Sequence, residues 1–192
     1  VVLIGTGVTT SLELVEAADE KEAHAVMDKL LLNGELDSAV TMHYSFPIGV
    51  STVGRVITPG KGKEMFIATT TGTSATERVP AMLKNTLYGI AAAKASGIAN
   101  PTVGILNIEG ARQVERALKK LQESGYSINF TESARSDGGV VMRGNDLLLG
   151  VPDIMVTDSL TGNVLMKMFS AYSSGGNYEA LGYGYGPGAG EN

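Results

Sequence analysis

The chain has 192 residues, 43% of them hydrophobic, which is enough apolar material for one core of domain size. The sequence lacks long charged tracts and apolar runs of about 18 residues, which excludes a disordered chain and a membrane span. A net charge of −5 without a stripe of Lys and Arg excludes nucleic acid as the main partner. With no cysteine and only two histidines, we expect no metal site and no cofactor, and a cytoplasmic location fits this usage.

The first half of the chain alternates short apolar runs with segments of helical periodicity. Apolar runs bounded by turn residues predict buried strands. Asp19 predicts the N-cap of a helix, and Asn33-Gly34 predicts its end. The expected strands cover residues 1–5, 12–17, 36–41, 54–57 and 64–70, and the expected helices cover residues 21–33 and 74–96.

The second half continues the alternation. Its clearest helix has an apolar face formed by Val114, Ala117, Leu118 and Leu121. The expected strands cover residues 101–108, 127–131 and 153–158, and the expected helices cover residues 109–124, 145–149 and 161–172. Strands that alternate with helices predict an α/β fold with a mostly parallel sheet covered on both faces. We expect one domain over residues 1–192, with a Gly/Tyr-rich segment over 173–192 that is either a linker or a loop closing over the site.

In such sheets, ligands bind at the carboxyl ends of the strands, where loops lead into helices. The first candidate is the hydroxyl-rich loop over residues 69–76, which the sequence places between a strand and a long helix. Its glycine allows close approach to a ligand, and its hydroxyls and backbone N–H groups suit a phosphate. The alternative is an ordinary Ser/Thr helix cap, with Glu77 completing a capping box.

Three further sites are candidates. Residues 158–167 again lead from a strand into a helix, with Asp158 able to orient water, a hydroxyl or a metal, and the alternative is a tight turn with a solvated lysine. His43 is a candidate general base, or else a histidine bonded within a packed loop. Arg135 and Arg143 are candidate clamps for a phosphate or carboxylate, or else members of a solvated loop.

Two segments resemble a known family in residue type and spacing. Residues 101–108 read P-T-V-G-I-L-N-I, and residues 153–167 read D-I-M-V-T-D-S-L-T-G-N-V-L-M-K. The bacterial phosphate acyltransferases of fatty acid and phospholipid synthesis have similar segments, P-x-V-x-L-L-N-I-G and D-V-V-V-C-D-G-F-x-G-N-V-x-L-K. A closer resemblance, through residues 41–54, 67–76, 142–148 and 182–188, is to the alpha subunits of component C of glycine/sarcosine/betaine reductase complexes.

The resemblance implies a three-layer α/β/α fold of the isocitrate/isopropylmalate dehydrogenase type. It implies phosphorolysis of a protein-bound acetyl thioester to acetyl phosphate. The implied partners are inorganic phosphate or acetyl phosphate, the other subunits of the reductase complex, and further copies in a homo-oligomer, without nucleic acid or membrane. The family's N-terminal Asp-Gly-Gly region is missing, so we expect the C-terminal part of a longer subunit.

Phosphate itself attacks the thioester in this chemistry, so the protein must hold the anion and stabilise an oxyanion. The residues expected to bind phosphate or substrate are Thr70, Thr71, Gly72, Thr73, Ser74, Asp158, Thr161, Gly162 and Arg143. The residues expected to be catalytic are His43, Asn163 and Lys167.

The chain also departs from the phosphate acyltransferase pattern. The family has S-A-G-N-T-G-A where residues 41–47 read T-M-H-Y-S-F-P, and D-L-G-A-N near residues 70–74, which argues against an acyl-carrier-protein substrate. Two functions stay open: the enzyme subunit just described, and a non-catalytic interaction subunit with a degenerate phosphate pocket. A nicotinamide-linked dehydrogenase is disfavoured, because no G-x-G-x-x-G follows a strand and the carboxylate cluster of a hydroxyacid site is absent.

Overall fold

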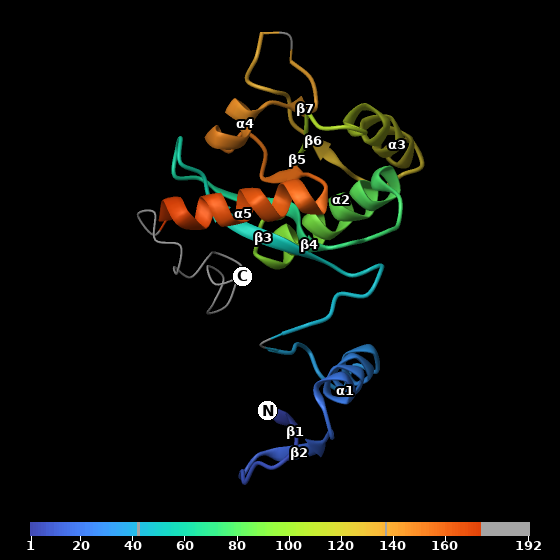
Figure 1. Cartoon of the computed structure of the whole chain (residues 1–192). Coiled ribbons are helices and arrows are strands. Elements are labelled where there is room, and N and C mark those ends of the chain that lie inside the picture. Colours follow the sequence, from blue (N-terminus) through green and yellow to red (C-terminus); the bar gives the residue numbers. More distant parts are fainter. Residues whose placement is uncertain (42, 137, 174–192) are drawn as a thin grey trace. The chain divides into compact units, whose positions relative to one another are not determined.

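The computed structural model describes residues 1–41, 43–136 and 138–173, and the chain divides into two compact units, Val1–Ser45 and Phe46–Asn192. Figure 1 shows the course of the chain. We describe each unit by itself, and the expectation of one domain over residues 1–192 stays a prediction. None of the helices in the described segments is long and apolar enough to cross a membrane.

The first unit contains two short parallel strands and one helix. Strand β1 (Val2–Gly5) pairs with β2 (Glu13–Glu16), and helix α1 (Glu20–Leu32) follows. The predicted cap is confirmed, because the Asp19 side chain accepts a hydrogen bond from the backbone N–H of Glu22 at 2.8 Å. Gly34 ends the helix with a positive φ of 71°, as the sequence predicts.

The strand predicted over residues 36–41 is wrong. These residues form no strand, and all except Leu36 are exposed. Val40 is fully exposed, so its side chain does not pack against a sheet or helix as a buried strand residue would. A short apolar run without a neighbour to pair with has no reason to form a strand.

The second unit is built on a six-stranded sheet. The strands are β3 (Ser51–Ile57), β4 (Glu64–Gly72), β5 (Thr102–Leu106), β6 (Asn129–Phe130), β7 (Val141–Met142) and β8 (Ile154–Val156). Their order is β3-β4-β8-β5-β6, and β7 also pairs with β5, beyond the point where β6 ends. All pairs are parallel except β3 with β4, so the predicted mostly parallel sheet is confirmed.

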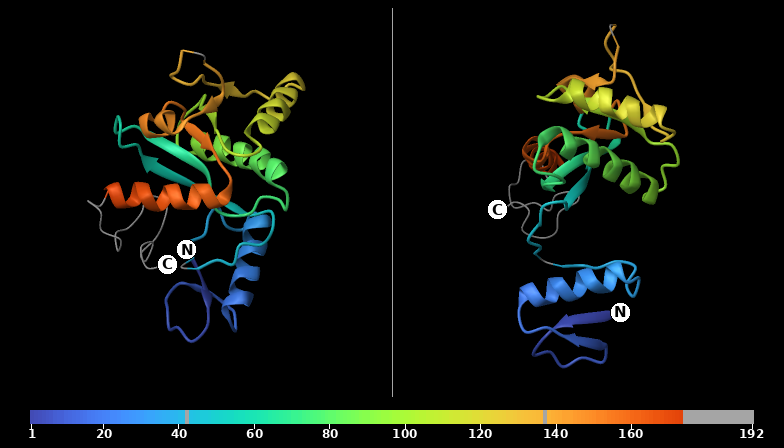
Figure 2. Two further views of the ribbon diagram at one scale, coloured as in Figure 1. Left: turned by 45° about the horizontal axis from the view of Figure 1, so that its top comes forward. Right: turned by 90° about the vertical axis from the view of Figure 1, so that its right-hand side faces the viewer.

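Four helices accompany this sheet in the described segments: α2 (Arg78–Ala95), α3 (Ala111–Glu123), α4 (Gly144–Leu149) and α5 (Ser159–Ser173). Figure 2 shows α2 and α3 on one side of the sheet and α5 on the other. The α/β class is therefore confirmed, and the arrangement is consistent with three α/β/α layers. The closer likeness to isocitrate/isopropylmalate dehydrogenases stays a prediction.

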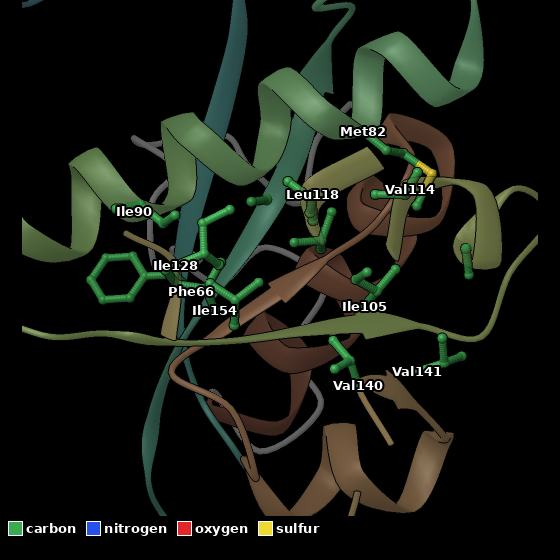
Figure 3. Close-up of a cluster of buried hydrophobic side chains, with 14 of the residues drawn as sticks. Phe66, Met82, Ile90, Ile105, Val114, Leu118, Ile128, Val140, Val141 and Ile154 are labelled. Carbon is green, nitrogen blue, oxygen red and sulfur yellow. The ribbon is translucent and has the colours of Figure 1, made fainter. Parts of the chain in front are cut away.

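The two faces of the sheet bury separate apolar clusters, because successive strand side chains point to opposite faces. Phe66 and Ile154 pack toward α2 and α3 with Val114 and Leu118, as Figure 3 shows. The alternate positions, including Met155, pack toward α4 and α5. The predicted apolar face of α3 is thus confirmed for Val114 and Leu118, which are fully buried.

Asp153 ties together three segments at the amino ends of β8 and β5. Its carboxylate accepts hydrogen bonds from the backbone N–H of Thr102 at 2.8 Å and from the Thr102 hydroxyl at 2.7 Å. The Nζ of Lys63, in the turn between β3 and β4, lies 2.9 Å from Asp153 Oδ1. Burial alone would raise the pKa of Asp153, but these hydrogen bonds and the lysine charge lower it below its usual value.

Several predicted boundaries shift. Strand β3 begins at Ser51, three residues before the predicted start, and β7 was not predicted. Helix α2 begins at Arg78, four residues after the predicted start at Ser74. Most of the predicted Gly/Tyr-rich segment, residues 174–192, lies outside the described residues.

Candidate functional site

A bulge at the carboxyl end of β4 forms one wall of the candidate site. Thr52 of β3 pairs with Thr71, but its neighbour Val53 pairs with Ala68, so Thr69 and Thr70 are left out of the register between these two strands. Strand β8 runs parallel to β4 on the other side and ends nearby at Val156. Bulges of this kind re-aim side chains and are frequent beside functional sites.

Most hydroxyls of this predicted loop serve the structure. The Thr70 and Thr52 hydroxyls lie 2.9 Å apart, and the Thr69 hydroxyl donates to the carbonyl of Thr52. Ser74 is buried, with its Oγ bonded to Asn85 Oδ1 and 2.7 Å from Ser51 Oγ. The hydroxyl density of the loop is therefore not by itself a sign of a ligand, because these groups fasten β4 to β3 and to α2.

The loop also differs from the predicted helix start. Residues 73–77 are not helical, and Glu77 occupies the N-cap of α2 without a side-chain hydrogen bond to the helix. Ser74 does not cap the helix, since its hydroxyl is engaged by Asn85 from within α2. The alternative interpretation, a Ser/Thr capping box with Glu77, is therefore wrong, and the segment is an irregular loop.

Asp158 shapes the second wall. It lies two residues after the end of β8, and its carboxylate accepts hydrogen bonds from the Thr161 backbone N–H at 2.9 Å and the Thr161 hydroxyl at 2.8 Å. These bonds satisfy donors in the first turn of α5. Thr161 therefore holds Asp158 in place.

Gly162 brings α5 against the β4 bulge. A Cβ built on this residue would lie 1.8 Å from the carbonyl oxygen of Thr69 and 2.7 Å from the Thr157 hydroxyl. Gly72 is constrained in a different way, because its φ is +82° and a Cβ added to it would lie 2.4 Å from the Val50 carbonyl oxygen. Close packing against backbone carbonyl oxygens explains why both positions are occupied by glycine.

The two walls enclose a pocket of about 290 Å³. Gly72, Thr73, Ser74 and Asp158, all predicted to bind phosphate or substrate, line it. The remaining lining residues are Thr69, Ala75, Thr76, Arg78, Ala81, Asn85, Ser159 and Leu160. The structure therefore brings together the two loops that the sequence singled out separately.

Arg78 is the cation among the described residues that line the pocket. Its Nη1 lies 3.8 Å from the Asp158 Oδ2 and 3.8 Å from the Glu109 Oε2, too far for direct hydrogen bonds. The Asp158 side chain is 18% exposed, whereas the Glu109 side chain is 85% exposed. The two carboxylates thus hold the guanidinium fork near the pocket by charge, and within the described residues no hydrogen bond engages its donors, which suit an oxyanion.

Four other predicted residues, Thr70, Thr71, Asn163 and Lys167, are not part of the pocket lining. Thr70 is buried, and the Thr71 hydroxyl donates to the Thr70 carbonyl and accepts from Asn163 Nδ2 at 3.2 Å. Asn163 thus connects α5 with the end of β4. Lys167 lies one turn further along α5 and is partly buried, outside the pocket lining.

Arg143 lies elsewhere in the unit, at the amino end of α4, and its side chain is exposed. The local structure is organised by buried Asp146, which accepts hydrogen bonds from the Ser133 hydroxyl, the Ala134 N–H and the Arg143 N–H at 2.7–2.9 Å. Burial alone would raise the pKa of Asp146, but these bonds, with the charge of Arg135, lower it below its usual value. Arg143 does not line the pocket.

His43 belongs to the first unit, whereas the pocket lies in the second. Its Nδ1 lies 2.8 Å from Glu20 Oε1, and both side chains are more than half exposed. The His43 imidazole is thus bonded to a carboxylate of its own unit. Its catalytic role stays a prediction.

Sequence reasoning missed Arg78 and Asn85. Arg78 was hidden because the predicted helix start at Ser74 placed it inside the helix rather than at its first turn. Asn85 is buried within α2, where its amide also donates to the Thr157 carbonyl at 2.9 Å. The sequence did contain a signal for Asn85, because a polar amide among the apolar residues of a buried helix indicates a hydrogen-bonding role. Within the described segments, no group of three or more His, Asp or Glu side chains forms a metal site.

Comparisons with known proteins agree on one family. The model of the fatty acid synthesis protein family matches residues 1–192. The chain is 69% identical over 191 residues to the alpha subunit of component C of the glycine/sarcosine/betaine reductase complex of Peptoclostridium acidaminophilum, covering 100% of this chain and 50% of that subunit. It is 28% identical over 183 residues to the phosphate acyltransferase of Geobacillus sp. (strain WCH70), covering 81% of this chain and 53% of the relative.

A second phosphate acyltransferase matches a shorter part of the chain at higher identity than the Geobacillus enzyme does. The phosphate acyltransferase of Acetivibrio thermocellus is 39% identical over 83 residues, 41% of this chain and 22% of the relative. The chain spans about half the length of the first two relatives. The resemblance predicted from residues 101–108 and 153–167 is confirmed, and the chain belongs to the fatty acid synthesis protein family.

Proposed function

We propose that this chain is part of an acyltransferase that moves an acetyl group from a thioester to phosphate within a glycine/sarcosine/betaine reductase complex. The observation that carries the proposal is that Arg78, Asp158 and the loop after β4 line the same pocket. The relatives' names, phosphate acyltransferase and component C subunit alpha, support the same assignment.

The reaction needs no nucleophile from the protein. An oxygen of hydrogen phosphate attacks the thioester carbonyl carbon, a C–O bond forms, and the C–S bond breaks. The sulfur leaves as a thiolate and takes up a proton from solvent, and the P–OH group releases its proton to solvent once the phosphate carries the acetyl group, so the products are acetyl phosphate and a free thiol. The protein's part is to hold the phosphate in line with the carbonyl and to stabilise the developing oxyanion.

The pocket residues suit the first of these tasks. Arg78 offers a fork of donors to two phosphate oxygens, and exposed Thr73 and Thr76 add hydroxyls to the lining. Asn163 and Lys167, on the helix that follows Asp158, remain our candidates for oxyanion stabilisation, together with His43. Arg143, outside the pocket, remains a candidate for binding another part of the substrate.

The partners follow from the composition and from the relatives' names. The chain has no cysteine, so the thiol that carries the acetyl group belongs to another subunit or to sequence outside these 192 residues. We propose other subunits of a reductase complex and further copies of this chain as its protein partners.

Replacement of the pocket arginine tests phosphate binding. We expect inorganic phosphate to bind the chain saturably and Arg78→Gln to weaken this binding about tenfold or more, because a hydrogen-bonded charge is removed. The measurement is the dissociation constant by isothermal titration calorimetry, with circular dichroism to verify the fold.

Arg116→Gln is the matched control, because it removes the same charge from an exposed position on α3 outside the pocket. Equal affinities for phosphate in the two variants would contradict the proposed pocket. Acetyl phosphate, titrated in the same way, should compete with phosphate for the site.

A further inference from the structure

A carboxylate such as that of Asp158 is unfavourable in an anion pocket, because it repels anions and donates no hydrogen bond. Yet Asp158 lines the same pocket as Arg78, and its side chain is only 18% exposed. Its position is fixed by two hydrogen bonds from Thr161. Capping of α5 accounts for these two bonds, but it does not account for a carboxylate in the lining of this pocket.

The hydrogen bonds of Asp158 leave capacity on both oxygens. Oδ1 accepts from the Thr161 N–H and Oδ2 from the Thr161 hydroxyl. Each carboxylate oxygen has two acceptor positions, so one position remains on each within the described part of the chain. Arg78, at 3.8 Å, is too distant to fill the remaining position on Oδ2 directly.

We propose that Asp158 and Arg78 together make this pocket selective for an oxyanion that carries a proton, and this inference rests on the proposed function. Arg78 donates to the unprotonated oxygens of hydrogen phosphate, while Asp158 accepts the hydrogen bond of its P–OH group. The chemical class of the ligand is therefore a protonated tetrahedral oxyanion, and phosphate is favoured over sulfate.

Sulfate is the discriminating comparison because it has the same shape and nearly the same size. At neutral pH sulfate carries no proton, so its oxygens are acceptors only. Placing it in this pocket sets two acceptors against each other at Asp158 and leaves the carboxylate unsatisfied. A site that forms a hydrogen bond with one group of its ligand rejects an analogue that lacks this group, because the site's own polar group is then left unpaired.

The same contact serves the proposed reaction. With its P–OH directed toward Asp158, the phosphate presents its remaining oxygens to Arg78 and to the thioester. The oxygen that attacks is then an unprotonated one, which is the better nucleophile. Asp158 is in this account a specificity-determining residue that contacts substrate.

The test measures dissociation constants for phosphate and for sulfate on the full chain by calorimetry. We expect the wild-type chain to bind phosphate at least tenfold more tightly than sulfate. Asp158→Asn should reduce this ratio toward one, because the variant loses the negative charge that disfavours sulfate and its amide N–H group donates to either anion. Asn still caps a helix well, so the variant should remain folded.

Glu109→Gln is the matched control. It removes the other negative charge at 3.8 Å from Arg78, and Glu109 does not line the pocket. We expect it to change the affinities for both anions alike, leaving their ratio as in the wild-type chain.

The outcomes separate this inference from the proposed function. Equal binding of phosphate and sulfate by the wild-type chain, or a selectivity unchanged in Asp158→Asn, would overturn the inference and leave the phosphate pocket intact. Absence of binding of either anion would overturn both. If Glu109→Gln lost as much selectivity for phosphate over sulfate as Asp158→Asn, the effect would come from net charge, and the role of Asp158 would be overturned.

Discussion

Gly162 leaves less room for an added Cβ than the other glycine near the pocket, Gly72, and its lack of a side chain permits α5 to lie against the bulge of β4. Glycine is normally unfavourable inside a helix, so Gly→Ala at an unhindered helical position is neutral or stabilising. At Gly162 the added methyl group would meet the Thr69 carbonyl at 1.8 Å. Backbone cannot move aside as a flexible side chain can, so α5 would have to shift.

We therefore expect Gly162→Ala to lower the free energy of unfolding by about 1–3 kcal/mol. Gly144→Ala, in the first turn of α4, is the control, because a Cβ there meets nothing within 4 Å. Urea unfolding followed by circular dichroism gives both values. Similar midpoints for the two variants would show that α5 does not rest on the bulge as described.

The sequence predicted part of the site at this scale. Gly72, Thr73, Ser74 and Asp158 line the pocket as expected, because parallel strands end at the same edge of a sheet. The hydroxyl bonds of Thr69 and Thr70 were not predictable, since they depend on a two-residue bulge, and Arg78 was missed because α2 begins four residues later than expected. A bulge leaves no clear mark in the pattern of apolar residues.

At the scale of elements, Asp153 fastens β8, β5 and the turn before β4 at the edge of the sheet away from the pocket. Its pKa in the folded protein lies below its usual value of about 3.9. A lowered folded-state pKa means that the ionised carboxylate stabilises the fold at pH values above about 4. This contribution disappears as the pH falls through the folded-state pKa.

We expect Asp153→Asn to destabilise the protein by about 1–3 kcal/mol at pH 7, with the deficit shrinking as the pH falls below about 4. Urea unfolding at a series of pH values measures this. Glu123→Gln, which removes an exposed charge from the end of α3, should show little effect at any pH. A deficit for Asp153→Asn that is constant from pH 7 to pH 3 would refute the account of this carboxylate.

Elements with strong local signals were predictable, and those that depend on distant partners were not. The amphipathic pattern fixed α3, and Asp19 and Gly34 marked the ends of α1. Residues 36–41 have a strand-like composition but form no strand, because no neighbour pairs with them. Strand β7 is two residues long, and only its pairing with β5 defines it.

For the whole molecule, the alternation of strands and helices was sufficient to predict an α/β fold. The strand order was not predictable from that alternation, because β8 lies between β4 and β5 although it follows both in sequence. This insertion sets Asp158 beside the loop after β4, although that loop lies far earlier in the chain. The pocket is therefore a product of the sheet's topology.

The most direct test of the central claim is release of thiol from an acetyl thioester of a small thiol, measured as a function of phosphate concentration. The chain contributes no cysteine to the background, so a thiol reagent reports the reaction cleanly. We predict a rate that rises with phosphate and saturates, equimolar formation of acetyl phosphate, and a marked loss of rate in Arg78→Gln but not in Arg116→Gln. Thiol release that is absent or independent of phosphate, in a chain that binds phosphate in this pocket, would contradict the claim and favour a non-catalytic interaction subunit.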